Sequence, residues 1–330
     1  MKVAVVILNW NGKLLLEQFL PSVIAHSNEA TIYVADNASS DDSIAFVKET
    51  YSTVKIIQNR ENGGYAKGHN DALKDLTEDV FVLLNSDVEV TEDWLIPVIS
   101  EFDKDNGLAA AQPKILDHKD KAYFEYAGAG GGFIDRLGYP YCRGRIFNTL
   151  EKDEGQYNDT ITIFWATGAC LFVRREAFWN VGGLDEDLFA HQEEIDLCWR
   201  MQSQGGKIKY IGSSTVYHLG GATLSAADPK KTFYNFRNSL LILLKNVMGF
   251  VAWRRIFIRM IWDGIAGLMF LVQGKPRHFI AILKAHFSFY RLIPKYLKKR
   301  KKWASGLSYA TINSVVWKYY IAKKRNFNNL

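Results

Sequence analysis

Short apolar runs alternate with segments of helical spacing over the N-terminal part of the chain. Runs of apolar, largely β-branched residues predict buried strands at residues 3–8, 31–35, 54–58 and 80–84. Helical spacing predicts helices at residues 14–25, 41–51, 63–76 and 94–102, the third of which begins as a loop. Strands that alternate with helices in this way predict an α/β fold with a Rossmann-like, mostly parallel sheet flanked by helices.

The middle of the chain is less regular. Residues 107–165 show no clear periodicity. The glycines at 128 and 130–132 are not followed by the G-K-[ST] of a phosphate-binding loop, so they predict a turn. A strand at residues 171–173 and helices at residues 175–181 and 193–204 follow.

The last part of the chain, from residue 232, is predicted to be helical. In residues 254–272, Arg255, Arg259 and Asp263 recur every four positions on one narrow helix face. Charges at this spacing argue against a transmembrane span, which needs ~20 apolar residues, and favour a helix in the membrane interface. The basic cluster at residues 298–302, beside Trp303, would be attracted to anionic headgroups by ~1 kcal/mol per charge. The alternative is an ordinary helical subdomain with a solvated basic face.

The net charge of +6 conceals two oppositely charged parts. Residues 1–231 carry 22 Lys and Arg and 34 Asp and Glu, for a net charge of −12. Residues 232–330 carry 19 Lys and Arg and the single acid Asp263, for a net charge of +18. We therefore expect a ligand-binding domain at 1–231 and a basic, apolar helical region at 232–330 that meets an anionic membrane surface. Nucleic acid is not an expected partner, because the tail is too apolar and no nucleic-acid-binding motif is present.

The N-terminal and cysteine patterns favour the cytoplasm. The apolar run at residues 3–8 is too short for a signal peptide, and no small-residue cleavage site follows it. Cys142, Cys170 and Cys198 are odd in number and have no C-x-x-C spacing, which is typical of a reducing compartment. Together with the basic tail, these patterns predict a peripheral protein at the cytoplasmic face of the cell membrane.

Polar clusters follow three of the predicted strands, at residues 9–11, 36–40 and 85–87. In parallel sheets, ligands bind at the carboxyl ends of strands. Asp36 can accept a hydrogen bond from a nucleobase N–H while Asn37 holds a ribose, or the cluster only caps the next helix. Asn85 and Asp87 can reach one hard cation that bridges a diphosphate, or they form only a strand-end turn.

Two further sets of residues can perform acid–base or metal chemistry. Glu193, Glu194 and Asp196 place three carboxylates within four residues, where repulsion raises a pKa and suits one group to proton transfer. The alternative is an acidic helix start favoured by the helix dipole. Asp196 lies four residues before Arg200 and is expected to pair with it. His218 follows a strand-like segment, either as a metal or phosphate ligand or as a structural histidine.

Taken in order, these segments resemble the family 2 glycosyltransferases, which have the GT-A fold, and above all rhamnosyltransferase-like members of bacterial polysaccharide assembly. The resemblance covers roughly residues 1–240, with matches at residues 5–11, 34–43, 62–70, 80–89, 167–174, 182–200 and 216–221. It implies an inverting enzyme that moves a sugar from a dTDP- or UDP-linked donor to a glycan or lipid-linked saccharide. The product would serve cell-surface polysaccharide synthesis.

The resemblance also implies a role for each matched residue. Asp36 matches the acid that binds the base, Asp87 the metal-binding acid of D-x-D, and His218 a histidine near the diphosphate. Glu193 and Glu194 match a Glu-Asp pair whose second acid is usually the catalytic base. Mg²⁺ or Mn²⁺ would bind at Asp87 and His218. The implied nucleotide-sugar site comprises Asn9, Asp36, Asn37, Asn62, Gly64, Lys67, Asn70, Asn85, Ser86 and Asp87.

Two residues depart from the family pattern. Asn85 replaces the first acid of D-x-D, which leaves Asp87 as the only acid of that element. Glu194 replaces the usual Asp, so Glu193 stays a rival for the base. On the acceptor side we expect Trp165, Thr167 and Gly168, with the indole of Trp165 as an apolar face for sugar C–H groups.

Other functions fit a fold of this kind. A nucleotidyltransferase usually needs a basic, glycine-rich loop after the first strand, which is absent here. A non-catalytic, membrane-bound binding protein with the GT-A fold stays an alternative because Asn85 replaces the first acid of D-x-D. A nicotinamide-dependent oxidoreductase is disfavoured because residues 9–13 lack G-x-G-x-x-G.

Overall fold

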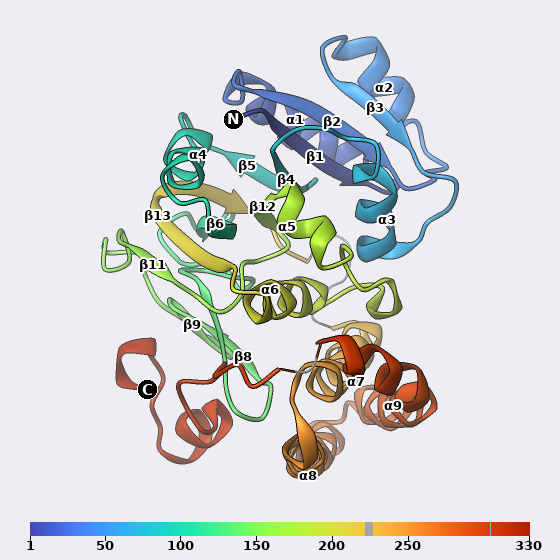
Figure 1. Ribbon diagram of the computed structural model, residues 1–330, viewed down its shortest axis with the longest axis vertical. Coiled ribbons are helices and arrows are strands. Elements are labelled where there is room, and N and C mark those ends of the chain that lie inside the picture. The colour runs from blue at the N-terminus through green and yellow to red at the C-terminus, as the bar shows by residue number, and fades with distance from the viewer. Residues whose placement is uncertain (222–226, 304) are drawn as a thin grey trace.

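The computed structural model describes residues 1–221, 227–303 and 305–330 and has a nine-stranded mixed sheet at its centre (Figure 1). The strands of this sheet are β1 (Val3–Asn9), β2 (Ala30–Asp36), β3 (Lys55–Gln58), β4 (Val80–Asn85), β5 (Val88–Val90), β6 (Leu108–Asp117), β11 (Thr160–Thr162), β12 (Cys170–Arg174) and β13 (Lys207–His218). Their order is β11-β13-β6-β12-β4-β1-β2-β3, with β5 paired to β13. This architecture confirms the predicted α/β fold.

Helices α1 to α6 cover the two faces of the sheet, and helices α7 to α9 pack beyond α6 (Figure 1). They are α1 (Lys13–Ala25), α2 (Ser43–Thr50), α3 (Gly64–Leu73), α4 (Leu95–Lys104), α5 (Arg175–Asn180), α6 (Glu193–Ser203), α7 (Pro229–Asn246), α8 (Gly249–Val272) and α9 (Pro276–Trp303). Successive strand residues point to opposite faces of the sheet. Val5 therefore belongs to the core cluster formed with α1, α2 and α4. Its neighbour Val6 belongs to the cluster on the other face, formed with α3, α5 and α6. Burial on both faces explains why β1 is apolar throughout.

The parallel part of the sheet brings the predicted strand ends together. β1 pairs in parallel with β2 and with β4. In this register Asn9 lies opposite Asp36, and Leu8 lies opposite Asn85. The polar clusters at residues 9–11, 36–40 and 85–87 therefore meet at one edge of the sheet, as predicted.

The region without clear periodicity is largely β-structure. It contributes β6 and β11 to the main sheet and forms a second sheet in the order β10-β9-β8-β7, with strands β7 (Gly132–Ile134), β8 (Pro140–Cys142), β9 (Arg145–Ile146) and β10 (Thr149–Leu150). The sequence did not predict β6, because its Ala-Ala-Ala-Gln-Pro segment has low strand propensity. Pairing with β12 and β13 stabilises it instead.

The C-terminal region is helical through α9, as expected, but not beyond it. The prediction of a helical tail is wrong for residues 305–330, where only the short turns Trp317–Ile321 and Phe327–Asn329 are assigned as helical. Val315 and Tyr319 pack instead against Tyr141 and Ile146 of the second sheet, and this packing replaces regular backbone hydrogen bonding. Within the described residues, no helix has both the length and the apolar character needed to span a bilayer. The division of the chain at residue 231 stays a prediction.

Candidate active site

Asp36 is held rigidly at the carboxyl end of β2. Its side chain is 4% exposed and accepts hydrogen bonds from Asn9 Nδ2 at 3.3 Å and from the backbone N–H of Ser39 at 3.2 Å. Asn9 is fully buried, and its Nδ2 also donates to Ser43 Oγ at 2.9 Å. The carboxylate is therefore fixed in position at the sheet edge where a base N–H can reach it.

An amide network joins Asn37 to the glycine-rich segment that follows β3. Asn37 Nδ2 donates to Asn62 Oδ1 at 3.0 Å and to the carbonyl oxygen of Gly64 at 3.1 Å. A Cβ on Gly68 would lie 2.9 Å from the Asn37 amide, so only glycine allows this approach. The structure thus brings Asn37, Asn62 and Gly64 together beside Asp36.

Two other residues of this segment have structural partners. Lys67 forms an ion pair with Asp71, one turn along α3. Asn70 Nδ2 donates to the Leu184 carbonyl at 2.9 Å, and Asn70 Oδ1 accepts from the Leu184 N–H at 2.9 Å. Because these contacts occupy the amide of Asn70, its contribution is to tie α3 to the segment that precedes α6.

His218, at the end of β13, lies between two carboxylates. Its Nε2 is 3.2 Å from Asp87 Oδ1, and its Nδ1 is 3.3 Å from Glu125 Oε2. These two carboxylates raise the imidazole pKa to about 10, although burial opposes the shift. Asn85 Nδ2 lies 3.4 Å from the same Nε2. Antiparallel pairing of β13 with β5 brings His218 opposite Val88, next to Asp87 in the chain.

Asp87 and His218 could share a divalent cation only after the imidazole gives up its proton, because a protonated ring nitrogen has no lone pair for a metal. Two neighbouring ligands at about 2.1 Å from one metal lie about 3 Å apart, and the Asp87 Oδ1 to His218 Nε2 distance is 3.2 Å. Across the described ranges, no group of three His, Cys, Asp or Glu side chains is spaced to hold a metal by itself. A cation held by this pair would therefore need further ligands from outside the described side chains.

The segment before α6 has a strained backbone. Phe189, His191 and Gln192 have φ values of 65°, 68° and 70°, a region that non-glycine residues seldom adopt. Fully buried Asn238 of α7 holds this segment, since its Nδ2 donates to the carbonyls of Leu188, Ala190 and His191. Backbone strain of this kind is commonly found at functional sites, and here it sets the direction in which α6 begins.

Glu193 and Glu194 occupy the first turn of α6 in different environments. Glu193 is 4% exposed, and its Oε2 has no hydrogen-bond partner among the described residues. Burial and the neighbouring Glu194 hold the pKa of Glu193 well above its usual range. Glu194 is half-buried, and burial raises its pKa to about 7. Both pKa values are raised, but only Glu194 is partly open to solvent, so it is the better placed of the two to exchange a proton.

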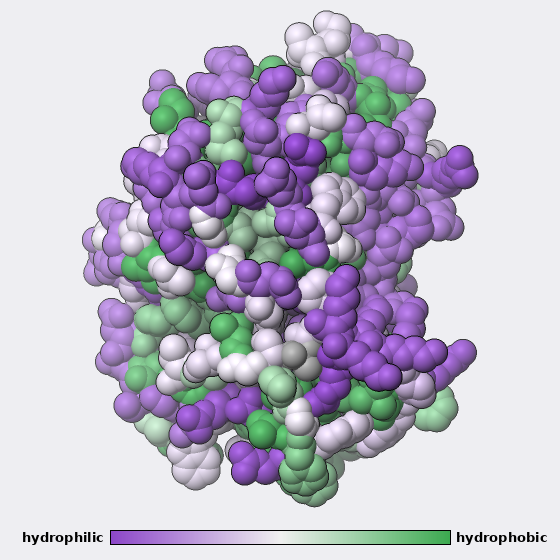
Figure 2. Space-filling model, viewed as in Figure 1, coloured by the Kyte–Doolittle hydropathy of each residue, from purple (hydrophilic) through white to green (hydrophobic). Residues whose placement is uncertain are grey.

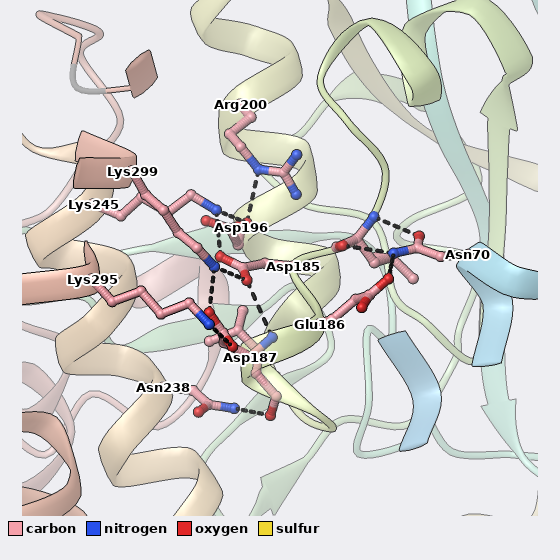
Figure 3. A network of polar contacts seen from close by, with 12 residues as sticks. Asn70, Asp185, Glu186, Asp187, Asp196, Arg200, Asn238, Lys245, Lys295 and Lys299 are labelled. Atoms are coloured by element: carbon pink, nitrogen blue, oxygen red, sulfur yellow. Dashed lines mark hydrogen bonds and ion pairs between the residues drawn. The ribbon is translucent and has the colours of Figure 1, made fainter. Parts of the chain in front are cut away.

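A buried ion network anchors α6 to the C-terminal helices (Figure 3). Arg200 Nε donates to Asp196 Oδ2 at 2.8 Å, which confirms the predicted pairing. Lys245 Nζ of α7 lies 2.9 Å from Asp196 Oδ2 and 2.7 Å from Asp185 Oδ2. Lys299 of α9 also pairs with Asp185. Asp196 is thus a structural residue, and α7 and α9 support the segment that carries the two glutamates.

The predicted acceptor-side residues lie deeper than expected. Trp165 is 5% exposed, and its Nε1 donates to the Phe133 carbonyl at 2.8 Å. Its indole packs so closely on Gly132 that a Cβ there would clash. The expectation that Trp165 offers an open apolar face is therefore wrong in this structure. Thr167 is also buried, and Gly168 accepts a hydrogen bond from Tyr65 Oη at 2.7 Å.

Comparison with known proteins identifies the family. A family model described as glycosyl transferase family 2 matches residues 4–182, more than half of the chain. The chain belongs to glycosyl transferase family 2.

Curated relatives in this family include rhamnosyltransferases. An N-acetylglucosaminyl-diphospho-decaprenol L-rhamnosyltransferase of Mycobacterium tuberculosis is 28% identical over 222 residues, which cover 62% of this chain and 71% of that protein. Rhamnosyltransferase WbbL of Escherichia coli K12 is 22% identical over 262 residues, which cover 77% of this chain and 94% of that protein. The chain is thus a rhamnosyltransferase-like member of family 2.

Solved structures share its fold. GalNAc-T7, solved with UDP, GalNAc and Mn²⁺, aligns with a TM-score of 0.58 at 17% identity over 98% of this chain and 57% of that one. A mannosyltransferase of Pyrobaculum calidifontis, solved with GDP-Man and Mn²⁺, aligns with a TM-score of 0.52 at 13% identity over 91% of this chain and 84% of that one.

Sequence reasoning missed two residues of this family 2 site. Glu125 shares His218 with Asp87, but no motif surrounds it in the sequence. Tyr65 is noticed only as part of the glycine-rich segment, although burial and the nearby Glu193 and Glu194 hold its pKa well above its usual range. Both residues reach the site through contacts between distant segments, which a single sequence does not reveal.

Proposed function

We propose that this family 2 protein transfers a sugar, with inversion, from a dTDP- or UDP-linked donor to a glycan or lipid-linked saccharide acceptor. The main support for the proposal is that the segment of Gly168 and Ala169 contacts both the strand end at Asn85 and Tyr65, which lies close to the two glutamates. Asn85 N–H donates to the Ala169 carbonyl at 3.0 Å. Tyr65 Oη donates to the neighbouring Gly168 carbonyl at 2.7 Å and lies close to the two glutamates.

The donor would lie along the strand ends. Asp36 accepts a hydrogen bond from the base N–H that uracil and thymine share, and Asn37 and Asn62 lie beside the ribose. Ser86, half-buried between Asn85 and Asp87, faces the diphosphate. Asp87, together with His218 once its imidazole has lost its proton, would hold Mg²⁺ or Mn²⁺, which would supply Lewis-acid stabilisation of the charge that develops on the leaving nucleoside diphosphate.

Glu194 would act as the general base. A pKa of about 7 makes its carboxylate available near neutral pH while keeping it basic enough to take a proton from an acceptor hydroxyl. The hydroxyl oxygen then bonds to the anomeric carbon on the face opposite the leaving diphosphate. One displacement of this kind inverts the anomeric centre. Glu193, which is buried more deeply, is less suited to this role.

The names of similar proteins suggest the class of donor and acceptor. One curated relative is named as a rhamnosyltransferase acting on a decaprenol-linked saccharide. Two structural neighbours are transferases that were solved with UDP or with GDP-Man. A lipid-linked acceptor also agrees with the basic, apolar C-terminal helices, which would keep the enzyme at the cytoplasmic face of the membrane. A role in cell-surface polysaccharide synthesis follows from such an acceptor.

Replacement of Glu194 tests the proposal. In an assay of nucleoside diphosphate released from dTDP- and UDP-sugars with Mn²⁺ and acceptor, Glu194→Gln should lower turnover by at least ~10²-fold. Binding of the donor, measured as a rise in unfolding temperature, should be unchanged. Glu49→Gln, at an exposed position on α2, is the matched control and should keep full turnover.

Two results would contradict this assignment. Near-normal turnover of Glu194→Gln would move the base to Glu193. Donor binding by the unaltered chain without any turnover, across donors and acceptors, would favour a non-catalytic binding protein with this fold.

A further inference from the structure

Two charged residues of helix α8, Arg259 and Asp263, point toward the protein, whereas Arg254 near the start of the helix is exposed. Its buried face consists of Ala252, Ile256, Arg259, Asp263 and Gly267. Arg259 is 3% exposed and Asp263 is 0% exposed. Arg259 Nε donates to Asp263 Oδ1 at 2.8 Å, and His286 Nε2 of α9 lies 3.2 Å from Asp263 Oδ2. The charges are therefore neutralised inside the molecule.

The outward face of α8 is apolar as a result. Its most exposed side chains are large and apolar, with exposures of 67% for Phe257, 52% for Ile261, 60% for Leu268 and 90% for Val272. From residue 257 to residue 272, the exposed side chains of this described helix include no charged residue. At 1.5 Å per residue this strip is about 24 Å long. Helices on the surface of soluble proteins normally show the opposite orientation.

The neighbouring helix α9 adds positive charge beside apolar residues. Exposed cations recur every seven residues, at Arg277, Lys284, Arg291 and Lys298. Because seven residues are nearly two helical turns, these side chains form one row. Beside this row lies a second set of exposed residues, Ile280, Leu283, Phe287 and Tyr290. No Asp or Glu occurs in α9 to balance the cations.

Part of the basic cluster at residues 298–302 serves a different purpose. Lys299 pairs with Asp185 and Asp187, and Arg300 donates to the carbonyl oxygens of Leu244 and Gly249. The expectation that this whole cluster meets headgroups is therefore wrong for these two residues, because internal partners hold them. The exposed row along α9 supplies the available cations instead.

We propose that the outward faces of α8 and α9 lie in the headgroup region of an anionic lipid bilayer. Apolar side chains of α8 would enter the acyl boundary, and the cation row of α9 would meet the lipid phosphates. Figure 2 shows hydrophobic residues among hydrophilic ones at the end of the molecule that carries α8. The inference deepens the membrane placement given under the proposed function by naming the faces that meet the lipid, and it does not rest on the transfer reaction.

A bilayer is favoured over a second copy of the chain. In a two-fold dimer through this face, the same surface of each copy contacts the other. The cation rows would then face one another without any acid on α9 to pair with them. An anionic surface offers both an apolar interior and negative charge.

Vesicle flotation tests the proposal. The full chain should float with vesicles of phosphatidylcholine and phosphatidylglycerol, and less with phosphatidylcholine alone. The double variant Phe257→Ser/Leu268→Ser should bind mixed vesicles at least ~10-fold more weakly, because it removes inserted apolar surface. Lys284→Glu/Arg291→Glu should lose the preference for anionic vesicles. The four side chains are exposed, so the fold should tolerate these changes.

The matched control is Leu14→Ser, because Leu14 is 77% exposed on α1, outside α8 and α9. It should float like the unaltered chain. Equal flotation of all variants would overturn the proposal. Loss of a solution dimer in Phe257→Ser/Leu268→Ser, with no vesicle binding by the unaltered chain, would also overturn it and assign the face to a second copy.

Discussion

Glu194→Gln is expected to stabilise the folded protein at high pH while it removes turnover. Burial raises the pKa of Glu194 from 4.5 to about 7. Each pKa unit corresponds to about 1.4 kcal/mol, so ionising this carboxyl in the folded state costs about 3 kcal/mol more than in the unfolded chain. Glutamine has nearly the same shape and needs no ionisation. The variant should therefore avoid that cost.

The sign of the pH dependence follows from the raised pKa. Below about pH 4.5, Glu194 is protonated in both the folded and the unfolded state, so the substitution should change stability little. As pH rises from about 4.5 to about 7, only the unfolded chain has lost this proton, and the unaltered protein loses stability. The advantage of Glu194→Gln should grow through this window and level off near 3 kcal/mol above it.

Thermal unfolding at several pH values measures this difference. A chain of 330 residues unfolds with an entropy of about 0.7 kcal/mol per kelvin, so about 3 kcal/mol corresponds to an increase of about 4 °C near pH 8.5. Asp196→Asn is a control that should change stability in the opposite direction, because Arg200 and Lys245 hold the pKa of Asp196 low. It should destabilise the fold at the same pH. The reasoning would be refuted if Glu194→Gln were less stable than the unaltered chain at pH 8.5. It would also be refuted if the substitution changed the unfolding temperature by the same amount at all pH values.

Two further predictions concern the buried network and the metal. Lys245→Met removes one of the two cations that pair with each of the buried carboxylates Asp185 and Asp196, and it should lower the free energy of unfolding by about 3 kcal/mol, the low end for a broken buried ion pair. Lys207→Met, which breaks an exposed pair with Asp105, should cost under about 1 kcal/mol. Equal losses of unfolding free energy for the two variants in denaturant titrations would show that the buried network adds no more stability than the exposed pair. Asp87→Asn should abolish the extra thermal stabilisation that Mn²⁺ adds to UDP binding, with EDTA-treated protein as the reference. An unchanged effect of Mn²⁺ would remove Asp87 from the metal site.

Local patterns were sufficient to predict which polar strand ends meet at one edge of the sheet. Apolar runs identified β1, β2 and β4, and polar residues at their ends identified Asp36 and Asp87. Parallel pairing brings these ends together whatever the details of packing. Asp196 and Arg200 are four residues apart on one helix, so their pairing was also predictable.

Contacts between distant segments were not predictable from the sequence. Lys245 reaches Asp196 from 49 residues away, and Glu125 reaches His218 from a loop without a motif. β6 has low strand propensity and exists because β12 and β13 pair with it. The separate environments of Glu193 and Glu194 depend on tertiary burial, although the two residues are adjacent in the chain.

The helix α8 separates what the sequence determines from what the tertiary structure decides. Periodicity alone shows that Arg255, Arg259 and Asp263 share one face, because side-chain direction follows from helical geometry. It does not show whether that face points to water or to protein. His286 of α9 and the ring of Tyr139 provide partners for the buried charges. Packing against these residues turns the apolar side outward, and only the folded chain brings them together.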